Sequence, residues 1–410
     1  MKYKMTLILL MLGFVWTCSN PPVQTGLDNL SGYRHLFENK RVGIITNHTA
    51  YDSQHRHISD VFFNMENVTI AAFFGPEHGI RGQAEAGEKV ASQKDPLKDI
   101  PIYSLYGKIR KPTAEMLKNV DVLVFDIQDI GARFYTYIYT MALAMEAAAE
   151  FQVPFVVLDR PNPITGRHVQ GNLLLPEFAT FVGLYPIPVR HGMTVGELAK
   201  MFNEESWLKD GVHADLTVVP LKHWRRSQWY DETQLQFTKP SPNIPSLQAA
   251  TVYPGVCLLE GTNVSEGRGT PTPFLLFGAP WIDGVQLTNA LNNLQLPGVE
   301  FKAAAFTPKS IPGAALHPKH ENRECFGAEI LITERDALQP YWNGIQIVNT
   351  IFQLYPDSLT WRIRHFDRLC GTATVRETIQ ARGELVTLRA SWQPALRNFL
   401  NIRKKYLLYE

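Results

Sequence analysis

The first two-thirds of the chain alternate between short apolar runs and segments with helical periodicity. Five apolar runs have the length and β-branched content of buried strands, at residues 41–46, 68–74, 120–126, 153–158 and 216–219. Helices are predicted at residues 58–64, 113–119 and 134–151, and from Thr194, where Glu197 completes a capping box. Strands that alternate with helices at this spacing indicate βαβ units, so the sequence predicts an α/β fold with a doubly wound, mostly parallel sheet.

The pattern changes beyond about residue 278. Helices are predicted near residues 285–294, 338–354 and 388–406, and strands near residues 299–306 and 325–332. This segment is interpreted as a second, smaller α+β domain. The predicted organisation is a leading segment (1–18), a tether (19–32), a larger catalytic domain (33–278) and the smaller domain (279–410).

Charge excludes one broad class of partner. The 410 residues contain 40 basic and 39 acidic side chains, which gives a net charge of +1, and no long basic run occurs. A wide electrostatic surface for nucleic acid is therefore not expected. The sequence gives no indication of the oligomeric state.

The amino terminus has the pattern of an export signal. Lys2 and Lys4 precede a mostly apolar run, residues 5–16, which is too short to span a bilayer. Cys18 follows this run, which predicts lipidation as in a bacterial lipoprotein; simple signal-peptidase cleavage is the alternative. Either process would export the protein to the cell envelope, as a periplasm-facing or outer-membrane lipoprotein in the first case.

The other three cysteines are Cys257, Cys325 and Cys370. They are widely separated, lack the spacing of a zinc site and cannot all pair with one another. They are therefore predicted to be buried apolar residues rather than a disulfide framework.

The apolar run at 68–74 ends in a tight turn that carries ionisable side chains. Pro76 and the surrounding glycines break the strand at once, because proline donates no hydrogen bond and glycine adopts angles that other residues avoid. Glu77, His78 and Arg81 therefore lie on a loop at the carboxyl end of a strand, where open α/β sheets form ligand crevices. A surface turn with solvated charges is the alternative.

Three other segments carry similar groups: Asp126, Asp129 and Arg133; Asp159 and Arg160; and Glu266 and Arg268 in a glycine-rich loop. The carboxyl ends of parallel strands face one side of a sheet, so these groups are expected to converge on one cleft with Glu77. The structural alternatives are helix capping by Asp126 and Asp129 and an internal salt bridge between Asp159 and Arg160.

Three kinds of chemistry compete as explanations of such a cleft. Two carboxylates on facing loops suit glycoside hydrolysis. A set of carboxylates and one imidazole would instead hold a hard cation in a phosphatase-type hydrolase. A nucleotide site is disfavoured because neither a G-x-G-x-x-G motif after the first strand nor a P-loop occurs.

Three tyrosines lie near the expected cleft: Tyr135, Tyr137 and Tyr139. They are predicted to pack in the core rather than to serve as sugar platforms. Tyr135 is near enough to the start of the helix to face the cleft instead.

The same segments carry a resemblance to a known family. The motifs are Gly43-Ile44-Ile45-Thr46-Asn47-His48, Gly75-Pro76-Glu77-His78-Gly79, Asp126 to Arg133, Leu158 to Pro163, Pro188 to Met193, Pro242-Asn243-Ile244-Pro245 and Leu259 to Thr270. Together they resemble the NamZ-type exo-β-N-acetylmuramidases, over a match that runs from about Tyr33 to Tyr409.

The resemblance implies an enzyme that removes N-acetylmuramic acid from the non-reducing end of peptidoglycan glycan chains. It also implies a Rossmann-like first domain whose cleft lies against a smaller second domain, with no cofactor or metal. Glu77 corresponds to the family's catalytic carboxylate, and Glu266 is assigned the role of the second one. The predicted substrate-binding residues are His78, Arg81, Asp126, Asp129, Arg133, Asp159, Arg160, Asn243, Asn263 and Arg268.

The residues also fit that substrate independently of the resemblance. N-acetylmuramic acid carries a lactyl carboxylate, and arginine is suited to bidentate binding of such a group. Two other functions remain open: a non-catalytic, lipid-anchored muropeptide-binding protein, and a metal-dependent ester hydrolase.

Overall fold

The larger region of the protein is a seven-stranded sheet in the order β3-β4-β2-β1-β5-β6-β9. The computed structural model describes residues 21–77, 79–80, 93–94 and 99–410. The strands are β1 (Lys40–Thr46), β2 (Val68–Gly75), β3 (Gln93–Lys94), β4 (Pro101–Ser104), β5 (Val122–Asp126), β6 (Phe155–Leu158) and β9 (Leu216–Val219). All pairs are parallel except β3 with β4. The predicted mostly parallel sheet is confirmed, and β3 and β4 are additions to it.

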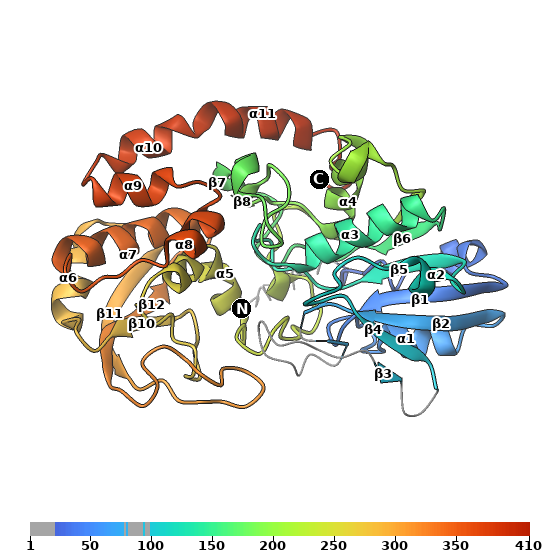
Figure 1. Cartoon of the computed structure of the whole chain (residues 1–410), viewed down its shortest axis with the longest axis horizontal. Helices are drawn as coiled ribbons and strands as arrows, with labels where there is room; N and C mark the ends of the chain where they lie inside the picture. Colours follow the sequence, from blue (N-terminus) through green and yellow to red (C-terminus); the bar gives the residue numbers. More distant parts are fainter. Residues whose placement is uncertain (1–20, 78, 81–92, 95–98) are drawn as a thin grey trace, which may run out of the picture.

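Helices cover both faces of this sheet, as a doubly wound fold requires (Figure 1). One face packs on α3 (Tyr137–Glu150) and α4 (Val195–Glu204), and the other on η1 (Leu30–Leu36) and α1 (Ile58–Phe63). The short α2 (Ala114–Leu117) precedes β5. Alternate residues of β1 point to opposite faces, with Ile44 in one core and Ile45 in the other.

Side-chain caps mark the starts of two of the predicted helices. Thr194 accepts from the Glu197 amide while the Glu197 side chain accepts from the Thr194 amide, which completes the capping box of α4. Thr113 accepts from the Met116 amide at the start of α2. Both helices therefore begin where the sequence placed them.

The second region is built on a three-stranded antiparallel sheet in the order β10-β12-β11. Its strands are β10 (Leu276–Ala279), β11 (Val299–Phe306) and β12 (Cys325–Ile332). Its helices are α5 (Leu247–Val256), α6 (Gly284–Asn293), α7 (Pro340–Leu354), α8 (Ile363–Cys370) and α9 (Thr374–Gln380), with η5 (Cys257–Gly261) after α5. The expected smaller α+β region is confirmed.

Residues 247–278 pack with this second region, which differs from the boundary placed near residue 278. Helix α5 crosses α7 at a close approach: a Cβ on Gly255 would lie 1.8 Å from the Pro340 carbonyl oxygen, and Gly344 faces Gly255. The reason is that β10 needs β12 as its partner, and β12 follows later in the chain.

Two segments connect the regions. Strands β7 (Gln170–Leu173) and β8 (Pro188–Arg190) form an antiparallel pair that the sequence did not predict, with η2 (Pro176–Phe178) between them. Helices α10 (Leu385–Ser391) and α11 (Gln393–Arg403) then run from the second region back to the first (Figure 1). The short helices η3 (Lys209–Gly211) and η4 (Tyr230–Glu232) complete the described fold.

The last residues of the chain attach to the first region. The Tyr409 hydroxyl donates to Asp159 at 2.5 Å and accepts from the Leu221 amide at 2.9 Å. The Leu408 amide donates to Glu197 at 2.8 Å. The carboxyl-terminal segment therefore holds α11 against the sheet.

Removal of the Tyr409 hydroxyl is expected to destabilise this attachment. Tyr409→Phe should lower the free energy of unfolding by about 1–3 kcal/mol, because the Leu221 amide loses its acceptor and Asp159 loses a donor at a buried site. Urea denaturation measures the change. Tyr355→Phe is the matched control, since its hydroxyl bonds at the surface with the Asp283 amide and Gln286, and a change within about 0.5 kcal/mol is expected. Equal losses in the two variants would contradict the prediction.

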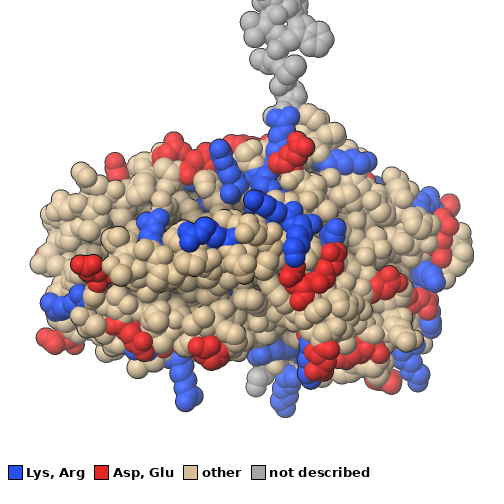
Figure 2. All heavy atoms as spheres, turned by 90° about the horizontal axis from the view of Figure 1, so that it is seen from above, with Lys and Arg blue, Asp and Glu red and all other residues tan. Residues whose placement is uncertain are grey.

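Cys257, Cys325 and Cys370 are buried and unpaired, as predicted. Cys18, the predicted lipidation site, lies outside the described residues. Among the described helices, none combines the length and apolar character needed to cross a membrane. Figure 2 shows basic side chains gathered near the centre of one face with acidic groups beside them, and uncharged surface over much of the remainder.

Candidate active site

A cavity of about 530 Å³ lies between the two regions. The first region contributes segments that follow β2 and β4 and precede α3, and the second contributes α5, η5, the 266–274 loop and α8. The residues used below are Glu77, Tyr106, Arg110, Tyr135, Thr136, Phe181, Glu260, Arg268, Arg362, His365 and Arg368. The volume is in the range of small-molecule sites.

Glu77 lies on the wall of this cavity formed by the first region. It follows β2 at the carboxyl end of the sheet, as predicted, and is partly exposed. The Thr136 hydroxyl donates to its Oε2 at 2.9 Å. Burial and the charge of nearby Glu77 raise the pKa of the Tyr106 phenol, so Tyr106 stays protonated beside the carboxylate. The Thr136 hydroxyl thus holds Glu77 in place, and a neutral phenol lies next to it. His78 and Arg81, which the sequence placed on the same turn, lie outside the described residues.

A second carboxylate of the cavity is Glu260, in η5. Arg268 contacts it at 2.7 Å, and the His365 Nε2 lies 3.5 Å from its Oε2. Burial alone would raise the pKa of Glu260, but Arg268 and His365 outweigh it and lower that pKa to about 2. Glu260 was not among the predicted site residues, although it follows an apolar run and lies within the Leu259-to-Thr270 motif.

Glu266, predicted to be the second catalytic carboxylate, does not line the cavity. It is 4% exposed, with the Lys319 Nζ at 2.9 Å from its Oε2 and the Arg268 Nε at 3.3 Å from its Oε1. Lys319 also donates to the carbonyls of Leu259 and Val264. The structure therefore places Glu266 behind Arg268, where it orients that guanidinium and braces the glycine-rich loop.

Three further arginines line the cavity: Arg110, Arg362 and Arg368. In the described part of the chain, none of them lies within ion-pair distance of a carboxylate. Arg110 stacks 4.5 Å over the Phe181 ring, and Arg368 donates to the His365 Nδ1. Because arginine only donates, Nδ1 is the acceptor and the His365 proton is on Nε2, facing Glu260. The described lining thus carries more guanidinium groups than carboxylates and suits an anionic ligand.

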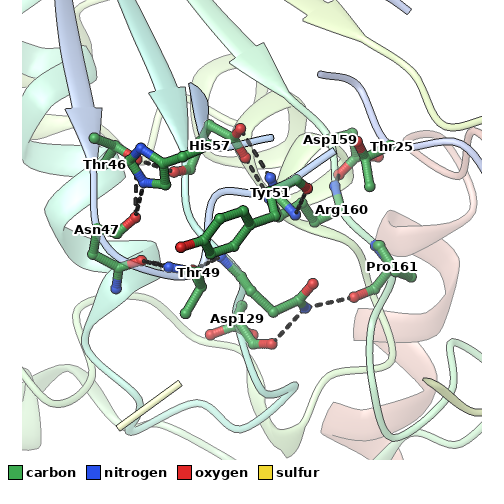
Figure 3. A network of polar contacts seen from close by, with 12 residues as sticks. Thr25, Thr46, Asn47, Thr49, Tyr51, His57, Asp129, Asp159, Arg160 and Pro161 are labelled. Carbon is green, nitrogen blue, oxygen red and sulfur yellow. Dashed lines mark hydrogen bonds and ion pairs between the residues drawn. The ribbon is translucent and has the colours of Figure 1, made fainter. Parts of the chain in front are cut away.

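Four predicted substrate-binding residues lie elsewhere: Asp126, Asp129, Asp159 and Arg160. Asp126 and Arg160 form a buried two-point ion pair. Arg160 also donates to the Tyr51 carbonyl at 3.1 Å (Figure 3). The internal salt bridge therefore joins Arg160 to Asp126 and not, as the alternative proposed, to Asp159.

The remaining two of these carboxylates are also engaged internally. Asp129 accepts from the Gly131 amide at 2.7 Å and lies 3.6 Å from the buried His191. Asp159 accepts from Thr194, Gly196 and Tyr409, and burial raises the pKa of Asp159 to about 7. None of the four lines the cavity, because the loops after β5 and β6 fold back and use these groups as braces.

Three other predicted residues support loops. Arg133 is fully buried and donates to backbone carbonyls. Asn243 donates to the Ala314 carbonyl at 2.7 Å, and Asn263 bonds the backbone of Ser358 and Thr360. Of the predicted set, the structure thus brings Glu77 and Arg268 together in the cavity. Tyr135 lines the cavity, and Tyr137 and Tyr139 are buried in the core, as expected.

Three of the charged side chains missed by the sequence reasoning come from α8 or its N-cap, and this helix was not predicted. Arg362, His365 and Arg368 recur every three residues and lie at the start of α8 or within it. This spacing places them on neighbouring positions of one helix face. The three side chains form the cationic wall of the cavity, and their spacing is a signal that could have identified it. For a metal, no group of three His, Cys, Asp or Glu side chains within the described ranges could act as a ligand set.

Comparisons with known proteins agree on one family. Models of the N-terminal and C-terminal parts of the exo-beta-N-acetylmuramidase NamZ match residues 42–248 and 251–409. The chain is 48% identical over 395 residues to the peptidoglycan beta-N-acetylmuramidase NamZ of Bacillus subtilis strain 168, covering 96% of this chain and 93% of that protein.

Two solved structures of DUF1343 family proteins from Bacteroides fragilis NCTC 9343 share the fold. One has a TM-score of 0.87 at 37% identity and the other 0.77 at 34%, and each comparison covers 95% of this chain and 99% of that one. The two family models together span both regions that enclose the cavity. The chain therefore belongs to the NamZ family of exo-β-N-acetylmuramidases, which are glycoside hydrolases.

Proposed function

We propose that this protein is an exo-acting glycoside hydrolase that releases N-acetylmuramic acid from the non-reducing end of peptidoglycan-derived glycans. One observation carries the proposal: Glu77, a carboxylate that accepts from the Thr136 hydroxyl, lies in the same cavity as three arginines that have no carboxylate partner among the described residues. The name of the Bacillus subtilis relative, a peptidoglycan beta-N-acetylmuramidase, supports the same activity.

The cationic wall accounts for a preference for N-acetylmuramic acid over N-acetylglucosamine. N-acetylmuramic acid differs from N-acetylglucosamine by a lactyl group on the ring, which adds one carboxylate. Arg368 is the best placed of the arginines to bind it, because Arg368 is half-buried whereas Arg110 and Arg362 are exposed. Partial burial strengthens a charge-assisted hydrogen bond relative to the same contact in water.

Glu77 is proposed to be the general acid. Its proton moves to the glycosidic oxygen as the bond between that oxygen and the anomeric carbon breaks, so the remaining sugar chain leaves as an alcohol. Water then supplies the new hydroxyl group at the anomeric carbon and returns a proton to Glu77. The hydrogen bond from Thr136 keeps the carboxyl group in place beside the cavity.

Glu260 is proposed to act through Arg268. Arg268 and His365 occupy its two oxygens, so Glu260 fixes the guanidinium in the cavity rather than attacking the sugar. The nucleophile that attacks the anomeric carbon is then water or the acetamido oxygen of the substrate itself.

Release of the aglycone from an aryl β-N-acetylmuraminide tests this function, with the aryl β-N-acetylglucosaminide as the matched control. We expect release from the muraminide only, with unchanged rates in EDTA. Binding of the muraminide without release would support the non-catalytic muropeptide-binding protein instead. Loss of activity in EDTA, restored by a divalent cation, would support a metal-dependent hydrolase.

We also propose that the protein is exported to the cell envelope and anchored there through Cys18. The positive leading residues, the short apolar run and the cysteine that ends it support this proposal. In a bacterial host, Cys18→Ser is expected to move the protein from the membrane fraction to the soluble envelope fraction. Cys325→Ser is the control and should leave the distribution unchanged; an unchanged distribution for Cys18→Ser would support simple cleavage.

A further inference from the structure

Arg133 joins three parts of the protein through its guanidinium. One terminal nitrogen donates to the carbonyls of Asn172 and Ile187 at 2.8 and 3.1 Å, which belong to the connection that carries β7 and β8. The other donates to the carbonyls of Leu369 and Cys370 at 3.1 and 2.7 Å. Those two carbonyls are at the carboxyl end of α8.

The same residue is next to the segment that holds Glu77. Tyr135 and Thr136 follow Arg133 by two and three positions, line the cavity, and include the hydroxyl that donates to Glu77. Helix α8 carries His365 and Arg368 on the opposite wall. Arg133 therefore connects the segment that holds Glu77 directly to the helix that carries His365 and Arg368.

The contacts of Arg133 hold the carboxyl end of α8 in one position. A cation at the carboxyl end of a helix interacts favourably with the helix dipole and satisfies carbonyls that lack helical partners. The planar guanidinium reaches four acceptors at once, which an ammonium group cannot do in the same plane. Arg133 is fully buried, and burial lowers its pKa. Gly371 follows the helix at φ +70°, and a Cβ there would lie 2.8 Å from the Arg133 Nη2, so the chain passes directly against the guanidinium.

We propose that Arg133 is a positioning residue that sets α8, and with it Arg368, at the working distance from Glu77. This proposal rests on the proposed function, because it assigns Arg133 a role in binding the lactyl carboxylate without touching it. Arg133 was expected from the sequence to meet the substrate directly; the geometry instead places its effect one contact away.

The principal test is the split between KM and kcat in Arg133→Lys. We expect KM for the aryl muraminide to rise about tenfold while kcat changes less than about threefold, because the displaced group binds the lactyl carboxylate and does not take part in bond breaking. Arg190→Lys is the matched control. Arg190 is also fully buried and donates to the Ile164 carbonyl and Gln170, but it has no hydrogen bond to α8, so KM should stay at the wild-type value.

A double-mutant cycle separates positioning from general loss of stability. Arg368→Gln should raise KM about 10–100-fold in the wild type but less than about threefold in the Arg133→Lys background, since the displaced arginine no longer contacts substrate. Equal effects of Arg368→Gln in both backgrounds, or an unchanged KM in Arg133→Lys, would overturn the proposal.

Two further measurements keep the proposal testable. If Arg133→Lys does not fold, Gly371→Ala places a methyl group against the guanidinium from the other side and should reproduce the KM effect. If the wild type releases no sugar, the proposed function fails first. The rate of amide hydrogen exchange over residues 363–370 then tests the attachment of α8 by itself. Exchange should be faster in Arg133→Lys than in Arg190→Lys, and equal rates would refute the proposed attachment.

Discussion

Glu77→Gln should lower kcat for a disaccharide with N-acetylmuramic acid at its non-reducing end by about 10²–10⁴-fold, with KM within about threefold of the wild type. Glutamine keeps the size and the contact with Thr136 but has no proton to transfer to the leaving oxygen. Release of the reducing-end sugar, followed by chromatography, measures the change.

The leaving group provides the decisive control for this role. The dinitrophenolate of a dinitrophenyl muraminide is a good leaving group that needs no protonation. The Glu77→Gln variant should therefore hydrolyse this substrate at a rate much closer to that of the wild type. Glu266→Gln is the matched carboxylate variant, and its main effect should be on stability, because Glu266 does not line the cavity and is paired with Lys319 and with the inner side of Arg268. Undiminished activity on the disaccharide in Glu77→Gln would remove the assigned role.

Arg368→Gln should reduce the preference for muramic over glucosamine substrates. Loss of one charge-assisted hydrogen bond to a carboxylate is worth about 1.5–3 kcal/mol, which corresponds to a rise in KM of about 10–100-fold. Values of kcat should fall less, because the contact is made in the ground state as well as in the transition state. Steady-state kinetics on the aryl muraminide measures the effect.

The comparison substrate makes this prediction specific. An analogue with a lactyl amide in place of the carboxylate should bind the wild type weakly and be affected little by Arg368→Gln. Arg41→Gln is the control variant, since Arg41 lies at the opposite end of β1 and pairs with Asp121. A KM that rises equally for the acid and the amide would assign Arg368 a purely structural role.

The sequence predicted the order of the elements in the first region because their burial is local and periodic. The runs at β1, β2, β5, β6 and β9 were identified from their apolar and β-branched residues, and the capping box of α4 fixed its start. Strands β3, β4, β7, β8 and β10 and helices α5, α8 and α9 were missed. The missed strands have two to four residues that include proline, glycine or polar side chains, so they lack the β-branched run that marks the equally short β9.

The candidate site was predicted only in part, for an electrostatic reason. A carboxylate at the end of a buried strand either serves a ligand or pairs with a nearby cation, and the residue type is the same in both cases. Asp126 meets Arg160 from another strand end and Glu266 meets Lys319 from a distant loop, and neither partner could be assigned from spacing.

The sequence alone determined the parallel sheet, the turn that places Glu77 at its carboxyl edge, and the family to which the motifs belong. Only the tertiary structure decided which charged groups share the cavity. Arg268, Glu260 and Arg368 reach Glu77's cavity because α8 packs on η5 and both elements face the cavity from the second region. Pairing between charges far apart in sequence depends on that packing, and neither residue type nor local periodicity contains it.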